Sequence, residues 1–194
     1  MLPLAQLFTH TLVLGASISA GYGTREGGIG AVLAKKVNPE ARVTNLARSG
    51  ATSLQSTQHL DFKKYDPSVV VGFDLFFWDA MRMQTGASFE KNTRRLFSEF
   101  EARKIPMIIA KVPVLELPFP AAQAILQNAK KVNILLTSLC AANTNCVLVD
   151  PLECYQEMSD TGKYFIDGLH LNDAGNHFCA EHFLKAGHLD RLKT

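Results

Sequence analysis

Short runs of aliphatic and β-branched residues alternate along this chain with longer amphipathic stretches. This alternation is typical of parallel strands joined by crossover helices that cover both faces of one sheet. The runs predicted to be strands are His10–Gly15, Arg42–Leu46, Ser68–Leu75, Ile105–Lys111 and Cys146–Asp150. All five are mostly apolar on both faces, as buried parallel strands are. The pattern therefore predicts an α/β protein, a three-layer αβα sandwich with about five parallel strands.

Helical periodicity fills the intervals between these strands. The predicted helices are Ile29–Val37, Ser88–Arg103, Ala121–Ala141 and Asp173–Leu184, and Asn172 just before the last of them is a capping signal. A chain of 194 residues has the size of one domain, and no linker or internal repeat divides it, so we expect a single domain over residues 1–194. In a right-handed βαβ series, the active site belongs at the carboxyl ends of the strands.

Composition excludes several classes of protein. Hydrophobic residues make up 47% of the chain, which is ample for a buried core, and the net charge is only +2. The basic residues are scattered in pairs rather than clustered, so no nucleic-acid partner is predicted. No apolar run reaches the roughly 18–20 residues of a membrane-spanning helix. The apolar start lacks a basic region before it, and we therefore expect no intact signal peptide.

The four cysteines all lie in the last third of the chain, at Cys140, Cys146, Cys154 and Cys179. An even number fits an oxidising compartment and allows three complete pairings. The alternative is four buried thiols in a cytosolic protein. Disulfides Cys140–Cys146 or Cys154–Cys179 would favour a periplasmic or secreted protein, and free thiols a cytoplasmic one. No CxxC or HxxxH pair places two ligands on one face, so no metal site is predicted.

Candidate catalytic residues lie where two of the predicted strands end. Ser17 follows the first strand in a glycine-rich turn, and its hydroxyl is a poor nucleophile unless a base removes its proton. Asp167 and His170 lie three residues apart in a turn that follows the fifth strand. We therefore predict a triad in which His170 accepts the proton of Ser17 and Asp167 orients the imidazole.

These motifs resemble those of the SGNH, or GDSL, hydrolases, which are esterases and lipases on a flavodoxin-like sandwich. The family's Gly-Asp-Ser block is similar to residues 15–17, and its second block is similar to residues 45–53. Its final Asp-x-x-His block is matched by Asp167 and His170. The resemblance implies a serine ester hydrolase that forms an acyl-enzyme on Ser17 and requires no cofactor. It also implies that the backbone N–H of Gly50 donates to the oxyanion.

Two departures from the family pattern affect the expected oxyanion hole. Ala16 replaces the aspartate that in the family helps to hold the nucleophile turn. In the third block, Gly-x-Asn-Asp, aligning Asp79 with the aspartate puts Phe76 at the glycine and Trp78 at the asparagine, although a shift of one residue is open. The asparagine donor is then missing. We expect the N–H groups of Ser17 and Gly50 and the indole N–H of Trp78 to form the hole.

Two acidic residues near the third block have open roles at this stage. Asp79 is interpreted as structural rather than as a carboxylate of the site. Asp74, within the third predicted strand, is expected either to bind buried backbone groups or to pair with a basic side chain, and the sequence does not choose between them.

The predicted substrate is a small-molecule, lipid or glycan ester with a short or medium acyl chain. Phe76, Phe77 and Trp78, with Val114 from the loop over residues 112–120, are expected to form an apolar wall for that chain. One alternative is a catalytically impaired member of this fold with a binding role. Another is a nucleotide-binding α/β protein, but the glycine-rich turn has neither GxGxxG nor GxxxxGK[ST] spacing. The sequence leaves the oligomeric state open.

Overall fold

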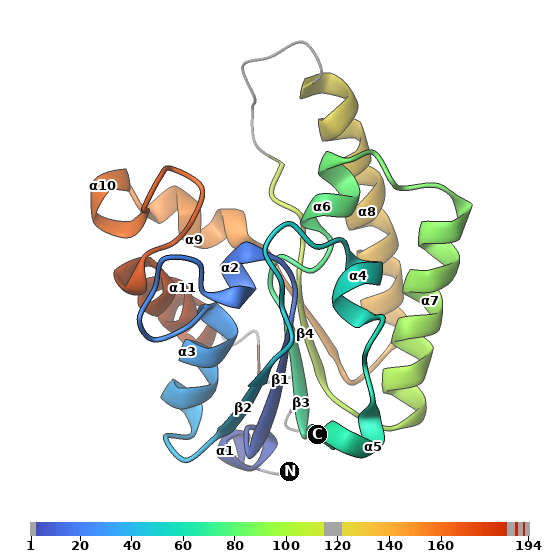
Figure 1. The fold of residues 1–194 in the computed structure, drawn as a ribbon, viewed down its shortest axis with the longest axis horizontal. Helices are drawn as coiled ribbons and strands as arrows, with labels where there is room; N and C mark the ends of the chain where they lie inside the picture. The colour runs from blue at the N-terminus through green and yellow to red at the C-terminus, as the bar shows by residue number, and fades with distance from the viewer. Residues whose placement is uncertain (1–2, 115–121, 186–188, 190–191, 193–194) are drawn as a thin grey trace.

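The computed structural model describes residues 3–114, 122–185, 189 and 192. Five parallel strands form one sheet in the order β2-β1-β3-β4-β5. They are β1 (His10–Leu14), β2 (Arg42–Asn45), β3 (Val69–Gly72), β4 (Met107–Ala110) and β5 (Cys146–Val149). Helices cover both faces of the sheet (Figure 1), so the structure confirms the predicted three-layer α/β fold.

The four predicted helices are present, with ends within one or two residues of the prediction. They are α3 (Ile29–Val37), α7 (Ala87–Ala102), α8 (Ala122–Ala142) and α11 (Asp173–Lys185). Shorter helices not predicted from periodicity are α1 (Leu4–Leu7), α2 (Ser17–Ala20), α4 (Ser53–Thr57), α5 (Phe62–Tyr65), α6 (Phe77–Met81), α9 (Pro151–Glu157) and α10 (Thr161–Tyr164). Several of these contain only one turn, too short for a periodic apolar face to show in the sequence.

Strand alternation divides the core into two clusters. Along β3, Val69 and Val71 face the side covered by α3, α9 and α11, whereas Val70 faces the side covered by α6, α7 and α8. β4 and β5 repeat the alternation and contribute to both clusters, whereas Leu12 and Leu14 of β1 both belong to the cluster on the side of α7 and α8. Burial on both faces explains the continuous apolar runs of β1, β3 and β4.

Two strand predictions need correction. The third strand was expected to reach Leu75, but it ends at Gly72, so Asp74 lies beyond the sheet edge rather than within the strand. The apolar residues after Gly72 continue the strand pattern in sequence, yet they pack into the core instead of pairing with a neighbouring strand. Phe73 belongs to the cluster on the α3 and α11 side, and Leu75 and Phe76 belong to the cluster on the α7 and α8 side. The second strand is an edge strand, and its Arg42 and Asn45 are exposed rather than buried on both faces.

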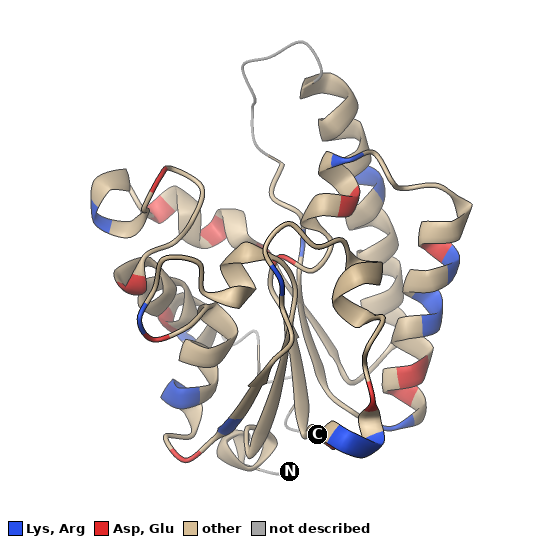
Figure 2. Cartoon of the chain, viewed as in Figure 1, with Lys and Arg blue, Asp and Glu red and all other residues tan. Residues whose placement is uncertain are grey.

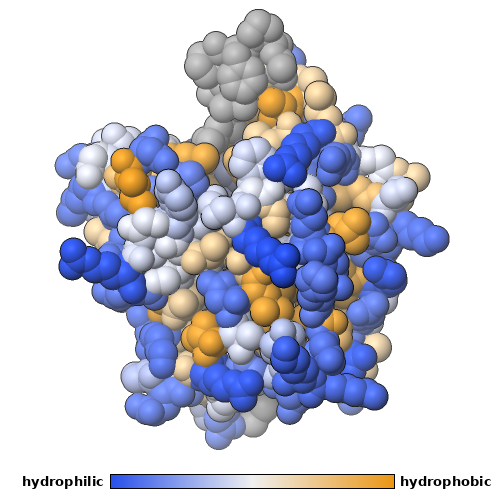
Figure 3. Space-filling view, in the orientation of Figure 1, coloured by the Kyte–Doolittle hydropathy of each residue, from blue (hydrophilic) through white to orange (hydrophobic). Residues whose placement is uncertain are grey.

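Two disulfides hold the last third of the chain. Cys140–Cys146 joins the end of α8 to the start of β5, and Cys154–Cys179 joins α9 to α11. Within the described ranges, no helix is both long and apolar enough to cross a bilayer. Side chains of both charge signs are interspersed over the helices in view (Figure 2), and hydrophobic side chains on the same face form small separate patches (Figure 3).

Candidate active site

Ser17 is the first residue of α2, directly beyond the carboxyl end of β1. Its Oγ lies 2.9 Å from Nε2 of His170. The imidazole Nδ1 lies 2.8 Å from Oδ2 of Asp167, so the three side chains form one hydrogen-bonded chain. A hydroxyl, an imidazole and a carboxylate in this order have the geometry of a nucleophile, its base and the group that orients the base.

The turn that carries Asp167 and His170 is fixed by its own backbone. Asp167 Oδ1 accepts hydrogen bonds from the backbone N–H groups of Leu169 (3.1 Å) and His170 (2.9 Å). These bonds, with that of the imidazole, lower the pKa of Asp167 to about 2. The carboxylate is therefore ionised at neutral pH, and its 47% exposed side chain leaves that charge solvated.

Two neighbours hold the imidazole and its turn in place. The ring of Tyr22, an exposed residue, lies 4.7 Å from the imidazole ring, centroid to centroid. Asn172 donates through Nδ2 to the carbonyl of Lys163 and accepts from the backbone N–H of Gly175, which confirms its role as a helix-capping residue. The base is thus fixed to the start of α11 while its own side chain is 18% exposed.

The loop that carries Gly50 lies next to the nucleophile turn. The N–H of Arg48 donates to the carbonyl of Gly15 over 3.1 Å, and Gly50 has a left-handed φ of 72°. After this loop, Thr52 caps α4 with Gln55 in a capping box. Gly50, predicted from its motif, is therefore held at the same sheet edge as Ser17.

Asp74 was left open by the sequence, and the structure shows that it binds backbone. Its carboxylate accepts hydrogen bonds from the N–H groups of Ala16 (2.8 Å), Ile18 (2.8 Å) and Ser19 (3.2 Å). Burial raises the pKa of Asp74, and the hydrogen bonds it accepts oppose that rise. Gly15 lacks a side chain where a Cβ would collide with this carboxylate.

The residues of the third sequence block lie beyond the third strand. β3 ends at Gly72, and Asp74 lies two positions further on, before α6. Trp78, which was aligned with the family's asparagine, lies in α6, and Phe76 precedes that helix. Apolar residues on both sides of Asp74 masked the end of the strand in the sequence, whereas the glycine at position 72 marks it.

Trp78 and Asp79 have different environments within α6. The Trp78 ring lies against Phe77 and under the guanidinium of Arg82, while its buried Nε1 has no hydrogen-bond partner among the described residues. Asp79 accepts from the backbone N–H (2.8 Å) and the hydroxyl (3.0 Å) of Ser53. Asp79 therefore holds the start of α4, which agrees with a structural role.

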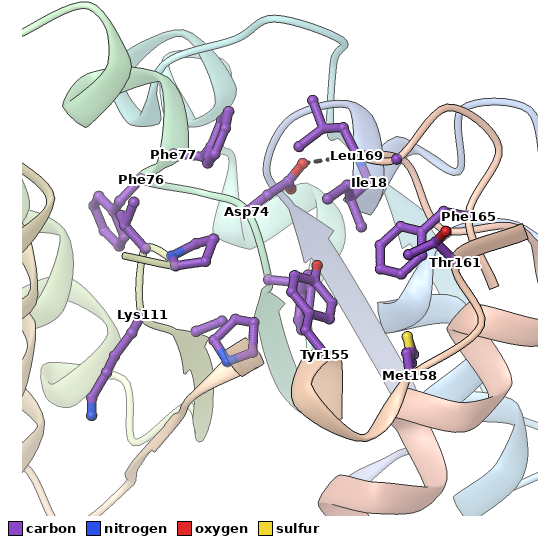
Figure 4. A pocket seen from close by; sticks show the side chains of 16 residues that line it. Ile18, Asp74, Phe76, Phe77, Lys111, Tyr155, Met158, Thr161, Phe165 and Leu169 are labelled. Atoms are coloured by element: carbon purple, nitrogen blue, oxygen red, sulfur yellow. Dashed lines mark hydrogen bonds between the residues drawn. The ribbon is translucent and has the colours of Figure 1, made fainter. Parts of the chain in front are cut away.

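A cavity of about 180 Å³ opens beside the triad. Ile18, the residue after Ser17, and Leu169, the residue before His170, line its wall (Figure 4). The side chains that make it apolar are Ile18, Phe73, Phe76, Phe77, Val112, Pro113, Pro151, Tyr155, Met158, Phe165 and Leu169. Asp74 and Lys111 also line it, but Lys111 points its amine away, toward Asp150 at 3.2 Å.

The cavity includes some of the residues predicted to bind substrate and omits others. Phe76 and Phe77 line it, whereas Trp78 and Val114 do not. Val114 packs against the core cluster on the side of α7 and α8 instead, and residues 115–120 of the predicted loop lie outside the described residues. The wall from α9 and α10 was not predicted, although Asp150 followed by Pro151 is a helix-start signal.

Among the described residues, no group of three or more His, Cys, Asp or Glu side chains is placed to hold a metal ion.

Comparison with known proteins decides the family. Residues 13–178 match the model of the GDSL-like lipase/acylhydrolase family. The chain belongs to this family. The match extends from β1 into α11, so it contains Ser17, Gly50, Asp167 and His170. No curated protein sequence matches the chain.

Solved structures of GDSL-type proteins share the fold. A structure titled TesA has a TM-score of 0.71 and 23% identity, covering 94% of this chain and 99% of that one. The psychrotrophic esterase EstA from Pseudoalteromonas sp. has a TM-score of 0.69 and 19% identity over 96% and 100% of the two chains. A family 3 carbohydrate esterase from Clostridium thermocellum has a TM-score of 0.65 and 17% identity over 95% and 98%. At these identities, the likeness shows the fold alone.

Proposed function

We propose that this GDSL-family hydrolase is a serine esterase that cleaves a carboxylic ester through an acyl-enzyme on Ser17. The observation that carries the proposal is the continuous chain of contacts from Ser17 through His170 to Asp167, at 2.9 and 2.8 Å. His170 takes the proton of Ser17 as the hydroxyl attacks the ester carbonyl, and then protonates the leaving alcohol. Water activated by the same imidazole hydrolyses the acyl-enzyme.

The negative oxygen of each tetrahedral intermediate needs hydrogen-bond donors. We assign these to the backbone N–H groups of Ser17 and Gly50 and to the indole N–H of Trp78. Taking Gly72 as the glycine of the family's third block puts Asp74 in the place of the asparagine, and its oxygens accept hydrogen bonds from the nucleophile turn. The hole is therefore atypical, and the buried unpartnered Nε1 of Trp78 is the donor left for it.

The acyl group of the substrate fits the apolar cavity beside Ile18 and Leu169. Its volume, about 180 Å³, is below the roughly 300–1,000 Å³ of pockets for drug-sized ligands, which favours a short or medium acyl chain. Phe76 and Phe77 contribute to one wall, and Tyr155 and Met158 to another. The leaving alcohol then remains on the exposed side, near Tyr22. The two disulfides favour a periplasmic or secreted location.

The experiment is hydrolysis of p-nitrophenyl esters from acetate to decanoate by the wild type and the Ser17→Ala and His170→Ala variants. We expect turnover that falls by about 10⁶-fold in either variant, as for triads that act as a unit. Turnover should also decline beyond medium chain lengths because the cavity holds only about 180 Å³. Equal rates in wild type and Ser17→Ala would exclude the proposal.

A second candidate, an impaired member with a binding role, is favoured by the carboxylate at the asparagine position. It predicts no ester turnover and no labelling of Ser17 by a fluorophosphonate. Nucleotide binding at the glycine-rich turn is disfavoured, because the Asp74 carboxylate already binds the N-terminus of α2, where a phosphate would have to lie.

A further inference from the structure

The backbone N–H groups of the nucleophile turn have no hydrogen-bond acceptor on the side chain of the residue before the helix. Ser17 begins a helix of four residues, and the first N–H groups of a helix have no partner within it. A side-chain oxygen on the residue before the helix normally supplies one. Ala16 stands there, and its side chain has no oxygen. Because Ala16 is fully buried, water does not readily take the place of the missing acceptor. The partner has to come from elsewhere in the chain.

Asp74 supplies it from 58 residues away. Its two oxygens engage the N–H groups of Ala16, Ile18 and Ser19, which are the residues on both sides of the nucleophile. The N–H of Ser17 is not among the groups it binds. Three of the four consecutive N–H groups are therefore fixed on one carboxylate, and the fourth belongs to the nucleophile itself.

We propose that Asp74 is the positioning residue of the nucleophile turn, taking over from the aspartate that is absent at Ala16 and leaving the Ser17 N–H to the oxyanion. The inference rests on the proposed esterase function. Asp74 acts through the turn: it orients the hydroxyl and the N–H of Ser17 without touching the substrate carbonyl.

The environment of Asp74 suits this role. Asp74 is 7% exposed, and no basic side chain in the described residues forms an ion pair with it, since the amine of Lys111 pairs with Asp150. Tyr155 across the cavity has its own pKa raised by burial and by the Asp74 charge, and Figure 4 shows its hydroxyl directed toward Asp74. Backbone N–H dipoles from the turn thus stabilise the carboxylate. An amide cannot replace it, because one of its two polar groups donates and would face an N–H.

The first test is Asp74→Asn, which keeps the size of the side chain. Turnover of p-nitrophenyl butyrate is measured per serine labelled by a fluorophosphonate, so that misfolded molecules do not count. We expect kcat per labelled serine to fall about 10- to 100-fold with KM within twofold, because a misaligned reacting group costs rate without removing the acyl cavity. An unchanged kcat per labelled serine would overturn the inference.

Asp61→Asn is the matched control. Asp61 accepts from the N–H groups of Lys63 and Lys64 at the start of α5, which, like α2, has four residues. Figure 1 shows α5 at the opposite end of the sheet from α2. We expect this variant to keep the wild-type kcat. A loss equal to that of Asp74→Asn would mean that any lost cap lowers the rate and would overturn a specific role.

The second test moves the carboxylate back to the family position. Ala16→Asp alone adds a second buried acid beside Asp74, so it should abolish activity. In the double variant Ala16→Asp/Asp74→Asn only one acid remains, and we expect kcat at least fivefold above that of Asp74→Asn. A double variant no more active than Asp74→Asn would contradict the exchange of roles. A wild type without turnover or labelling would instead refute the esterase itself.

Discussion

Two aspartates lie on opposite sides of Ser17, and their environments are opposite. Asp167 is on an exposed turn, and the hydrogen bonds of that turn and of the imidazole lower its pKa to about 2. Asp74 is buried beneath the nucleophile turn, and burial raises its pKa. Both accept hydrogen bonds from backbone N–H groups, yet Asp167 also binds the imidazole that must move a proton, whereas Asp74 binds three N–H groups of the nucleophile turn.

The contrast teaches how one residue type serves two tasks. The exposed carboxylate of Asp167 keeps its negative charge at little cost in free energy. It can stabilise the positive charge that develops on His170 during the reaction. The buried one is placed among N–H groups whose positions it determines, as buried polar networks do when all members are satisfied. Removing the Asp167 carboxylate should slow the reaction and leave the fold intact. Changes at Asp74 should instead alter the geometry of the nucleophile turn.

Asp167→Asn breaks the exposed side of this comparison and should have the largest effect. The amide loses the charge that stabilises the imidazolium and favours the wrong tautomer, so we expect kcat to fall by about 10⁴-fold. Thermal unfolding should be nearly unchanged, because the side chain is largely exposed. Asp160→Asn, an exposed cap of α10, is the control and should keep full activity. A loss below tenfold in Asp167→Asn would mean that Asp167 does not orient His170.

Trp78→Phe tests the indole N–H as a buried donor to the oxyanion. Phenylalanine keeps an aromatic ring beside Phe77 and Arg82, but it removes the Nε1 donor together with the five-membered ring that carries it. If the indole N–H donates to the oxyanion, kcat falls about 100- to 1,000-fold with little change in KM. Steady-state kinetics with a short p-nitrophenyl ester measure this. An unchanged kcat would show that Ser17 and Gly50 alone form the hole.

The same contrast explains what could be read from sequence. The alternation of apolar runs with amphipathic stretches is a local pattern, and so is the Asp167-x-x-His170 spacing. These patterns predicted the fold and the contact of Ser17, His170 and Asp167 that the structure contains. The function of Asp74 depends on bonds to residues 16–19, 58 to 55 positions away, which no local pattern encodes. The end of β3 was misplaced because Phe73 and Leu75 continue the apolar run while turning away from the sheet.

The pH profile gives the smallest and most specific effect. His170 accepts a proton only when neutral, so kcat/KM should fall as the medium becomes acidic and the imidazole is protonated. Asp167 has a pKa lowered from 3.8 to about 2, and the stability that its ionised form contributes is lost only as the pH falls from about 4 toward 2. The acid limb should therefore follow a single proton between pH 8 and pH 4. A limb steeper than one proton in that range would show that a carboxylate titrates together with the imidazole. That carboxylate would be Asp74, whose pKa is raised by burial.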